Sequence, residues 1–304
     1  MAHPTVHIPV LLKEVLEWSG IDRQATEPRT IVDGTLGGGG HAWHLIKKLS
    51  PQDTLIGIDR DGGAIDRVTK LFDAELPKDS CHVRLIQSSY RDLPNLMEEY
   101  HIPKADCILL DLGLSSDQLE DRERGFSFRV GGDLDMRFCT EEGISVRDLL
   151  AKIDEKDLAD IIYQFGEERF SRRIARTIVE RRKSDPVQTA EQLADLVHRC
   201  VPGSRIPGRI DSATRTFQAL RIAVNHELKH VEDAMRMLPN CLTPGGRLLV
   251  ISFHSLEDRI VKHAMRDNEH LKVLTKKPIE ASEEETNENS RSRSAKMRVA
   301  ERCS

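Results

Sequence analysis

The sequence predicts an α/β fold in which a parallel sheet is interrupted, after its fourth strand, by a helical insert. Short apolar runs alternate with segments of helical spacing, a pattern typical of βαβ units and a parallel sheet. The apolar runs are nearly continuous, as expected for strands covered on both faces. The fourth expected strand ends at residue 113 and the fifth begins at residue 245, whereas one crossover needs only ~30 residues.

The expected elements follow in order from residue 30. The first strand ends in an Asp-Gly pair, and four consecutive glycines and a helical segment come next. A long amphipathic helix is expected before the fifth strand, and the last helix is expected after it. Ser255 and Asp258 are expected to form the capping box of this last helix. The acidic stretch 280–288 is expected to be a polar loop between two closing strands. The expected strands are 30–35, 54–61, 81–90, 105–113, 245–253, 271–278 and 293–302, and the helices are 41–49, 62–72, 93–102, 213–238 and 254–267.

The segment between the fourth and fifth strands shows helical spacing without a strong strand pattern. Four segments have apolar residues at helical spacing: 141–153, 158–166, 169–182 and 189–200. The domain organisation predicted from this pattern is a first part of the sheet domain at 1–115, a helical insert at 116–211 and a second part at 212–304.

The composition is that of a globular protein of the cytoplasm. Hydrophobic residues make up 38% of the 304 residues and charged residues 31%. No apolar run approaches the ~20 residues that cross a bilayer, and the N-terminus lacks a signal-peptide pattern. The six cysteines form no CxxC pair, so we expect reduced thiols, no metal site and a cytoplasmic location without a membrane partner.

The charge is unevenly distributed. The net charge is −5, which argues against a simple nucleic-acid binder. Between Arg169 and Arg221, however, twelve basic residues face five acidic ones, and between Arg291 and Arg302 five face one. These segments are interpreted either as solvated helix faces or as two basic patches suited to a polyanion.

The glycine run from Gly37 to Gly40 indicates that a ligand approaches the backbone closely, with a flexible turn as the alternative. Ligands of parallel sheets bind at the carboxyl ends of the strands. Asp33, Asp59, Asp111 and His254 all lie at such ends. The strand ends therefore predict a binding site.

Two ligands compete for this site. The residues GGGGHA fit a loose GxGxxG/A pattern with Asp59 22 residues beyond Gly37, as in NAD sites. S-adenosylmethionine is favoured because Asp33 would neutralise its amino group but would repel a pyrophosphate. Asp59 is expected to accept hydrogen bonds from ribose hydroxyls in either case, unless it only stabilises its own turn.

Longer motifs make the chain resemble one family. They are HIPVL (7–11), DGTLGGGGH (33–41), DLGLSSDQLE (111–120), RGFSF (124–128), DLDMR (133–137), GEERF (166–170), ISFHSLEDRIVK (251–262) and RSRSAKMRVAER (291–302). In this order the chain resembles the bacterial ribosomal RNA small subunit methyltransferase H family, also called MraW, over nearly its whole length.

The resemblance implies a Rossmann-like class I S-adenosylmethionine-dependent methyltransferase sheet with an inserted helical domain. It implies methylation of N4 of a specific cytidine in 16S rRNA of the small ribosomal subunit, near the decoding site. It leaves a homodimer open. The cofactor positions that it carries over are Gly39, Gly40, His41, Asp59, Tyr90, Asp111 and Gln118, with Asp33 added from the argument above. Tyr90 would stack on adenine or, alternatively, fill the core.

Methyl transfer to the cytosine amine needs hydrogen-bond acceptors that hold the amine in place and a group that accepts its departing proton. Asp111, Ser115 and His254 are the catalytic candidates, together with Ser116 and nearby backbone carbonyls, and His254 is alternatively a turn residue before a helix. Phe126 and Phe128 are candidates for stacking on the flipped base, unless they are core residues. Arginines are the candidate phosphate contacts: Arg124, Arg137, Arg172, Arg173 and Arg176. Other functions left open are methylation of DNA or of a small molecule, and a non-catalytic role in ribosome assembly.

Overall fold

The computed structural model describes residues 9–23, 27–202 and 211–304. The chain divides into two compact units. The first comprises Met1–Ser115 and Leu228–Ser304, and the second comprises Ser116–Glu227. Each unit has its own core and is described by itself.

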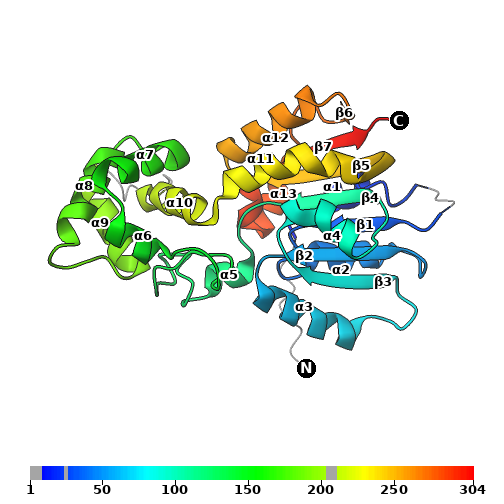
Figure 1. The fold of residues 1–304 in the computed structure, drawn as a ribbon, viewed down its shortest axis with the longest axis horizontal. Helices are drawn as coiled ribbons and strands as arrows, with labels where there is room; N and C mark the ends of the chain where they lie inside the picture. The colour runs from blue at the N-terminus through cyan, green and yellow to red at the C-terminus, as the bar shows by residue number, and fades with distance from the viewer. Residues whose placement is uncertain (1–8, 24–26, 203–210) are drawn as a thin grey trace. The chain divides into compact units, whose positions relative to one another are not determined.

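The first unit is built on a seven-stranded sheet in the order β3-β2-β1-β4-β5-β7-β6 (Figure 1). The strands β1 to β5 are parallel, and β7 runs antiparallel to both β5 and β6. The predicted strands are thus confirmed, although the edge strand β3 is half-exposed and not buried on both faces. The strands are β1 (Thr30–Asp33), β2 (Thr54–Asp59), β3 (His82–Gln87), β4 (Ala105–Asp111), β5 (Leu242–Ser252), β6 (Leu271–Val273) and β7 (Lys296–Arg302).

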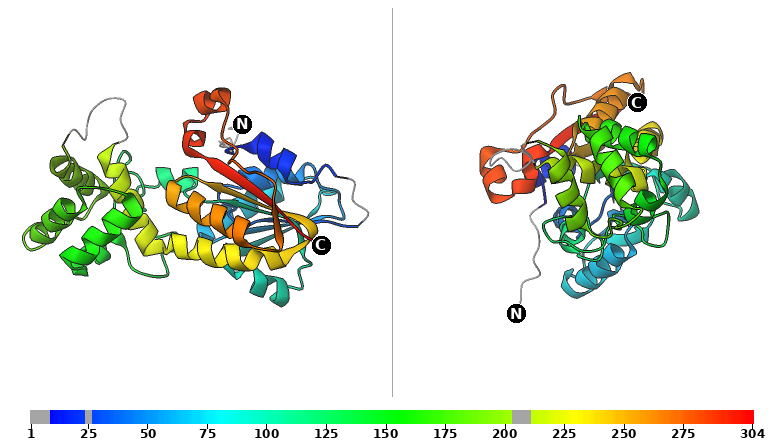
Figure 2. Two further views of the ribbon diagram at one scale, coloured as in Figure 1. Left: turned by 90° about the horizontal axis from the view of Figure 1, so that it is seen from above. Right: turned by 90° about the vertical axis from the view of Figure 1, so that its left-hand side faces the viewer.

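Helices cover both faces of this sheet, because alternate residues of each strand point to opposite faces. Leu248 and Val250 of β5 join one core cluster, and Leu249 and Ile251 join the other. The first cluster is packed by α4 (Leu93–Glu99), α11 (Glu227–Met237) and α12 (Ser255–Asp267). The second is packed by α1 (Leu12–Trp18), α2 (Gly40–Ile46) and α3 (Gly62–Glu75) (Figure 2).

The strand order places a topological switch point between β1 and β4. From β1 the chain continues to β2 and β3 on one side, and β4 begins the other side of the sheet. In the register, Asp33 lies beside Leu109 of β4, and Asp111 lies beside Ile251 of β5. Ligands of open α/β sheets bind at such a point, outside the carboxyl ends of the strands.

The second unit is helical. Packing contacts join α7 to α8 and α10, and α9 to α8 and α10. The four helical segments expected in the insert are confirmed. The helices of this unit are α5 (Ser116–Glu120), α6 (Val146–Lys152), α7 (Glu155–Gly166), α8 (Ser171–Arg181), α9 (Ala190–Cys200) and α10 (Ser212–Asn225).

The prediction of one long helix at 213–238 was wrong. The structure has two helices there, α10 and α11, because His226 adopts a left-handed backbone with φ of 53°. The Asn225 side chain donates to the carbonyl of Met136 and accepts from the amide of Phe138, which fixes the end of α10. The apolar spacing continues across the one-residue break, so periodicity alone could not reveal it.

Because of this break, α10 belongs to the second unit, which ends at Glu227 and not at residue 211. Gly166 at the end of α7 allows the close approach of α10. A Cβ atom at Gly166 would lie 2.5 Å from the carbonyl oxygen of Arg215, so only glycine fits without a backbone shift.

The C-terminal region corrects two expectations. The acidic stretch is no loop, since it forms α13 (Glu283–Glu288) with Ser282 as its N-cap, followed by the 3₁₀ turn η3 (Ser290–Ser294). In Figure 2, α13 lies beside α1. The closing strand predicted at 293–302 is confirmed as β7, but the basic-patch interpretation does not apply to Arg298, which is buried and bonds Asp258 through Nε and Nη2 at 2.6 and 3.0 Å.

None of the helices in the described part of the chain combines the length and the apolar character that a membrane span requires.

Candidate active site

The glycine loop between β1 and α2 is fixed by backbone hydrogen bonds. The Gly37 amide donates to Asp59 Oδ2 at 2.7 Å, and the Gly39 amide donates to the Leu36 carbonyl at 2.7 Å. Gly39 has a φ of 77°, and a Cβ there would lie 2.9 Å from Val68 Cγ1. This position therefore requires glycine on both conformational and steric grounds. Since two amides of the loop already have internal acceptors, the loop offers little to a pyrophosphate.

Asp59 connects the second strand end to this loop. Its Oδ2 accepts from Gly37, and its Oδ1 accepts from the Asp61 amide at 2.9 Å. Burial raises the pKa of the Asp59 carboxyl. The backbone amides of Gly37, Asp61 and Arg60 act on this carboxyl, and a carboxylate has about four acceptor sites. Asp59 therefore has the turn-stabilising role and still has acceptor capacity for a ligand.

Asp33 and Asp111 flank the switch point and have unsatisfied oxygens. Asp33 is 1% exposed. Its Oδ1 accepts from the Thr35 amide at 3.2 Å, but Oδ2 has no hydrogen-bond partner among the described residues. Asp111 Oδ1 is likewise buried and unsatisfied within the described chain. Buried polar atoms of this kind are rare in native proteins and point to an absent ligand.

The electrostatics of this pair favour a positively charged ligand. Burial raises the pKa of Asp33 to about 7. Burial, and secondarily the charges of Asp33 and Glu257, raise the pKa of Asp111 well above its usual range. A positively charged ligand would favour the ionised form of both carboxyls.

His41 does not supply that positive charge. Its Nε2 lies 2.9 Å from the Val10 carbonyl, to which it donates, so neutral His41 has a bare Nδ1. This Nδ1 lies 3.6 Å from Asp111 Oδ2. Because burial lowers the pKa of His41 to about 4, the imidazole is neutral near pH 7. His41 was predicted as a cofactor-binding residue and stays a prediction in that role; the structure places its ring beside Asp111.

The fourth and fifth strand ends meet through Gly113 and Phe253. A Cβ at Gly113 would lie 3.3 Å from the Phe253 ring, so the two loops are in contact. The Phe253 amide donates to Glu257 Oε2 at 2.9 Å. These contacts bring His254 to the same edge of the sheet as Asp111.

His254 caps α12, and the expected capping box of Ser255 and Asp258 was wrong. His254 Nδ1 accepts from the Glu257 amide at 3.3 Å, and Glu257 Oε2 accepts from the His254 amide at 3.3 Å. The cap thus begins one residue earlier than expected, and Asp258 bonds Arg298 instead. The lone pair of His254 Nδ1 is used by the cap, which favours the helix-cap interpretation of this residue.

Tyr90 and Ser115 lie beside the glycine loop. A Cβ at Gly34 would be 3.0 Å from Tyr90 Cβ, and a Cβ at Gly37 would be 3.3 Å from Ser115 Cβ. Tyr90 is half-buried and packs against the first core cluster, so its core interpretation holds at least for part of the ring. Gly40 is the first residue of α2. Gln118 lies in α5 of the second unit and stays a prediction as a cofactor contact.

Several predicted substrate residues are engaged inside the second unit. The Arg124 guanidinium donates to the carbonyls of Arg137 and Phe138, and Arg137 bonds Asp135 with two arms at 2.9 and 2.7 Å. Phe126 is buried and stacks on Phe138 at 5.7 Å between ring centroids.

Phe128 packs edge-on against Phe217 at 5.1 Å. The core interpretation therefore fits Phe126 and Phe128 better than base stacking does.

Three of the arginines of α8, which are the predicted phosphate contacts, are exposed. Arg173 Nη2 lies 3.5 Å from the carbonyl of Arg199, and Arg176 Nε lies 3.4 Å from Glu155 Oε1. Arg172, Arg173 and Arg176 share the solvent face of α8, whose other face buries Ile174 and Ile178. Arg205 and Arg209, which contribute to the basic count of this region, lie outside the described residues.

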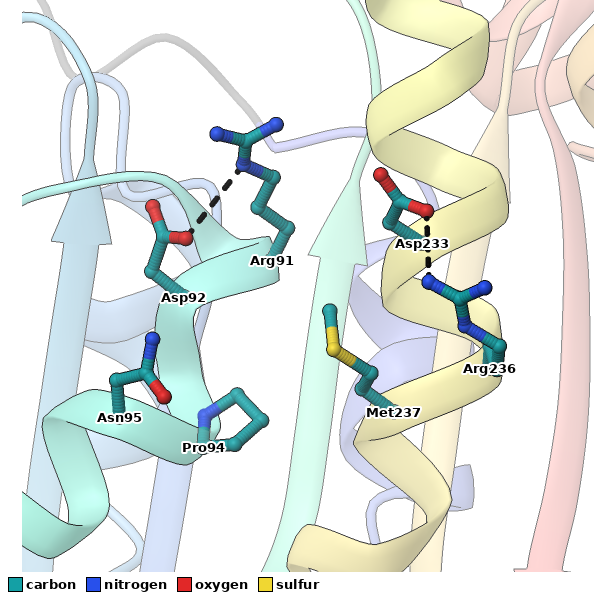
Figure 3. Close-up of a pocket in the computed structure, with 7 residues that line it drawn as sticks. All are labelled: Arg91, Asp92, Pro94, Asn95, Asp233, Arg236 and Met237. Carbon is teal, nitrogen blue, oxygen red and sulfur yellow. Dashed lines mark hydrogen bonds and ion pairs between the residues drawn. The ribbon is translucent and has the colours of Figure 1, made fainter.

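A further pocket of the first unit lies between α4 and α11 (Figure 3). Its charged groups pair with one another: Arg91 with Asp92, and Arg236 with Asp233 at 3.0 Å. None of the strand-end carboxylates lines it. Its charged side chains are paired, so it lacks the feature that marks the switch point as a site.

Known proteins place this chain in one family. The profile of the MraW methylase family matches residues 4–303. The chain belongs to the MraW methylase family. A protein named ribosomal RNA small subunit methyltransferase H from Rhodopirellula baltica is 46% identical over 309 residues, covering 99% of this chain and 93% of that relative. A protein of the same name from Deinococcus deserti is 47% identical over 301 residues, with 99% and 95% covered. Among solved structures, an rRNA methylase from Streptococcus thermophilus aligns with a TM-score of 0.44 and 8% identity, covering 100% of this chain and 99% of that one.

As a member of this family, the chain is a methyltransferase, and its cofactor is S-adenosylmethionine. The first unit has the Rossmann-like sheet of the class I S-adenosylmethionine-dependent enzymes. The residues at the switch point fit this group. The cofactor carries a sulfonium and an ammonium charge, and the site offers two buried carboxyls, Asp33 and Asp111, each with an unsatisfied oxygen.

Sequence reasoning missed several residues of this site. The Thr35 hydroxyl accepts from the Asp111 amide at 2.6 Å, and buried Glu257 ties the loop of Phe253 to α12. Val10 supplies the carbonyl that orients His41. The motif HIPVL was a signal for Val10, but Thr35 and Glu257 form contacts that only the folded chain reveals.

Glu285 of α13 holds the segment next to His41. Glu285 Oε1 accepts from the Leu11 amide at 2.7 Å, and Leu11 is buried with φ of 54°. Glu285→Ala is expected to destabilise the protein by about 1–3 kcal/mol, because it leaves a buried amide without its acceptor. Urea denaturation checks this, with exposed Glu284→Ala of the same helix as the control. Equal midpoints for both variants would contradict the anchoring role.

Proposed function

We propose that this chain methylates N4 of a specific cytidine in 16S rRNA of the small ribosomal subunit, near the decoding site, with S-adenosylmethionine as the donor. The proposal takes its substrate from the names of the related proteins and from the family resemblance of the motifs. It places the enzyme in the cytoplasm, where ribosomal subunits are assembled.

The observation that carries the proposal is the pair of unsatisfied carboxyl oxygens, Asp33 Oδ2 and Asp111 Oδ1, at the switch point. A dinucleotide would bring a pyrophosphate, which two adjacent carboxyls disfavour. A ligand with two positive charges would relieve both groups. NAD is therefore a poor candidate for the same site, and S-adenosylmethionine suits it.

The residues of the first unit have distinct tasks in this mechanism. Asp33 binds the ammonium end, and Asp59 accepts from the ribose hydroxyls with the lone pairs that Gly37 and Asp61 leave free. Tyr90 offers an aromatic face beside the loop. The cofactor supplies an electrophilic methyl group on its sulfonium. The chain has to hold the cytidine amine in line with that group, which is the main source of rate in such a transfer.

Asp111 is the proton acceptor in this proposal. Once N4 has gained the methyl group, it carries an extra proton, which passes to a carboxylate oxygen of Asp111. Burial raises the pKa of Asp111, so its carboxylate accepts a proton more readily than an ordinary aspartate does. Ser115 lies beside the same loop and is a candidate for positioning the amine.

The second unit is proposed to recognise the RNA. Its exposed arginines on α8 present positive charge over a rigid helix, and phosphate contacts depend on such charge. A small-molecule substrate would need no such surface. Two buried carboxyls without full hydrogen bonding would bring no benefit to a non-catalytic assembly factor, since such groups destabilise the fold.

Methyl transfer to purified subunits tests the proposed function. The protein is incubated with S-adenosylmethionine carrying a labelled methyl group and with small subunits that lack the modification. Nuclease digestion and mass spectrometry then identify the labelled nucleoside. The proposal expects N4-methylcytidine at one position. Label on ring carbon C5, on a ribose hydroxyl or only on DNA would contradict it.

His254 provides a separate prediction. His254→Ala is expected to destabilise the protein by about 1 kcal/mol, because an N-cap is lost. His254→Asn should restore the stability, since asparagine is a good N-cap. If turnover recovers with it, His254 acts through the cap. A turnover that stays ~10²–10⁴-fold low in a fully stable His254→Asn protein would instead make His254 the proton acceptor.

A further inference from the structure

The turn between α7 and α8 exposes two aromatic rings. Tyr163, in the last turn of α7, is 59% exposed, and Phe170, the N-cap of α8, is 38% exposed. Only four residues connect the two helices, so both rings lie at the same end of the helical pair. Large side chains of this kind are usually buried, and an exposed pair suggests a partner.

This turn is held rigidly from inside. The buried Glu168 side chain accepts from the Phe170 amide at 2.9 Å, and Gln218 Nε2 of α10 donates to the Phe165 carbonyl at 2.9 Å. Gly166 lies directly against the backbone of Arg215. The exposure of the rings is therefore a property of a fixed backbone.

Three arginines lie close to Phe170 along the chain. Arg169, Arg172 and Arg173 are all exposed, and they lie in the turn and in the first turn of α8. The acid exposed in the same turn is Glu167. Aromatic faces beside positive charges suit unpaired bases and the phosphates that link them. A protein partner with an apolar surface would not need three arginines, so we favour RNA as the partner.

We propose that Tyr163, Arg169, Phe170, Arg172 and Arg173 form a platform that binds an unpaired segment of the RNA substrate. Bases stack on Tyr163 and Phe170, and the arginines contact the phosphates between them. This proposal rests on the proposed function, which supplies RNA as the substrate. To the arginines of α8 it adds Tyr163 at the end of α7 and the turn residues Arg169 and Phe170 as a surface for unpaired bases.

The test measures the affinity of the full chain for small subunits that lack the modification. Tyr163→Ala is expected to weaken binding about tenfold, or about 1.4 kcal/mol, as for loss of one base stack. Tyr163→Phe should bind like the wild type, because it keeps the ring. Arg172→Gln should lower the affinity and also reduce the slope of log affinity against log salt by about one. The control is Ile144→Ala, since Ile144 is an apolar side chain of the same unit that is 46% exposed.

Each result has a definite meaning. Affinity for S-adenosylhomocysteine should be unchanged in all variants, which shows that the fold and the cofactor site are intact. Wild-type affinity in both Tyr163→Ala and Phe170→Ala would overturn the platform, even if the wild-type protein methylates rRNA. Unchanged RNA affinity with a lower molecular mass in light scattering would make the surface a protein interface and would also overturn it. Failure of the wild-type protein to methylate rRNA would instead count against the proposed function.

Discussion

Asp33→Asn is expected to stabilise the ligand-free protein at pH 8 while abolishing tight binding of S-adenosylhomocysteine. The folded protein holds the Asp33 carboxyl at a pKa of about 7, against its usual 3.8. At pH 8 the buried group must ionise, at a cost of up to about 4 kcal/mol relative to the unfolded chain. An uncharged amide avoids this cost. It cannot bind an ammonium group as a carboxylate does.

The free energy of unfolding should also depend on pH because of Asp33. Between the two pKa values the folded wild-type protein binds more protons than the unfolded chain, so its stability falls as pH rises from about 4 to about 7. The negative charge of Asp59 also raises the pKa of Asp33 and acts in the same direction. Urea denaturation from pH 5 to 8 should show a smaller decrease in Asp33→Asn than in the wild type. The control is Asp73→Asn on the exposed side of α3. Parallel curves for all three proteins would rule out a buried, reluctantly ionised Asp33.

Asp111→Asn is expected to reduce both cofactor affinity and turnover, the latter by ~10²–10⁴-fold as for loss of a general base. The variant keeps the side-chain shape and the hydrogen bond from the Asp111 amide to Thr35. It removes the carboxylate that is proposed to lie on the sulfonium side of the cofactor and to accept the proton released from N4.

Calorimetry with S-adenosylhomocysteine and single-turnover methyl transfer separate the two effects. Normal single-turnover rates at saturating cofactor would leave Asp111 with a binding role only, and the proton acceptor would then have to be Ser115 or a backbone carbonyl.

Much of the fold could be predicted because parallel strands leave a strong pattern. The runs that became β1, β4 and β5 are apolar on both faces, and the gap after β4 made the insert visible. Two of the errors have local causes. The break at His226 needs one left-handed residue, which leaves the helical spacing undisturbed. The α13 helix is short and polar, so its formation depends on the Ser282 cap and on the contact between Glu285 and Leu11, which no local pattern reveals.

The candidate site was predictable only in part. Asp33, Asp59 and Asp111 end strands, and strand ends can be read from a sequence. Whether a carboxyl oxygen has a hydrogen-bond partner cannot be read from a sequence. Asp59 accepts from the amides of Gly37 and Asp61, while one oxygen each of Asp33 and Asp111 has no partner among the described residues. The same limit explains His254 and Phe126, whose partners Glu257 and Phe138 emerge only from the packing.

The central claim is that the cofactor binds at the switch point between β1 and β4. A crystal structure of the protein with S-adenosylhomocysteine tests it most directly. The account predicts the ligand's ammonium group within hydrogen-bond distance of Asp33 Oδ2, its ribose hydroxyls at Asp59 and its sulfur on the side of Asp111. A ligand bound instead in the pocket between α4 and α11, with the oxygens of Asp33 and Asp111 still unpaired, would contradict it.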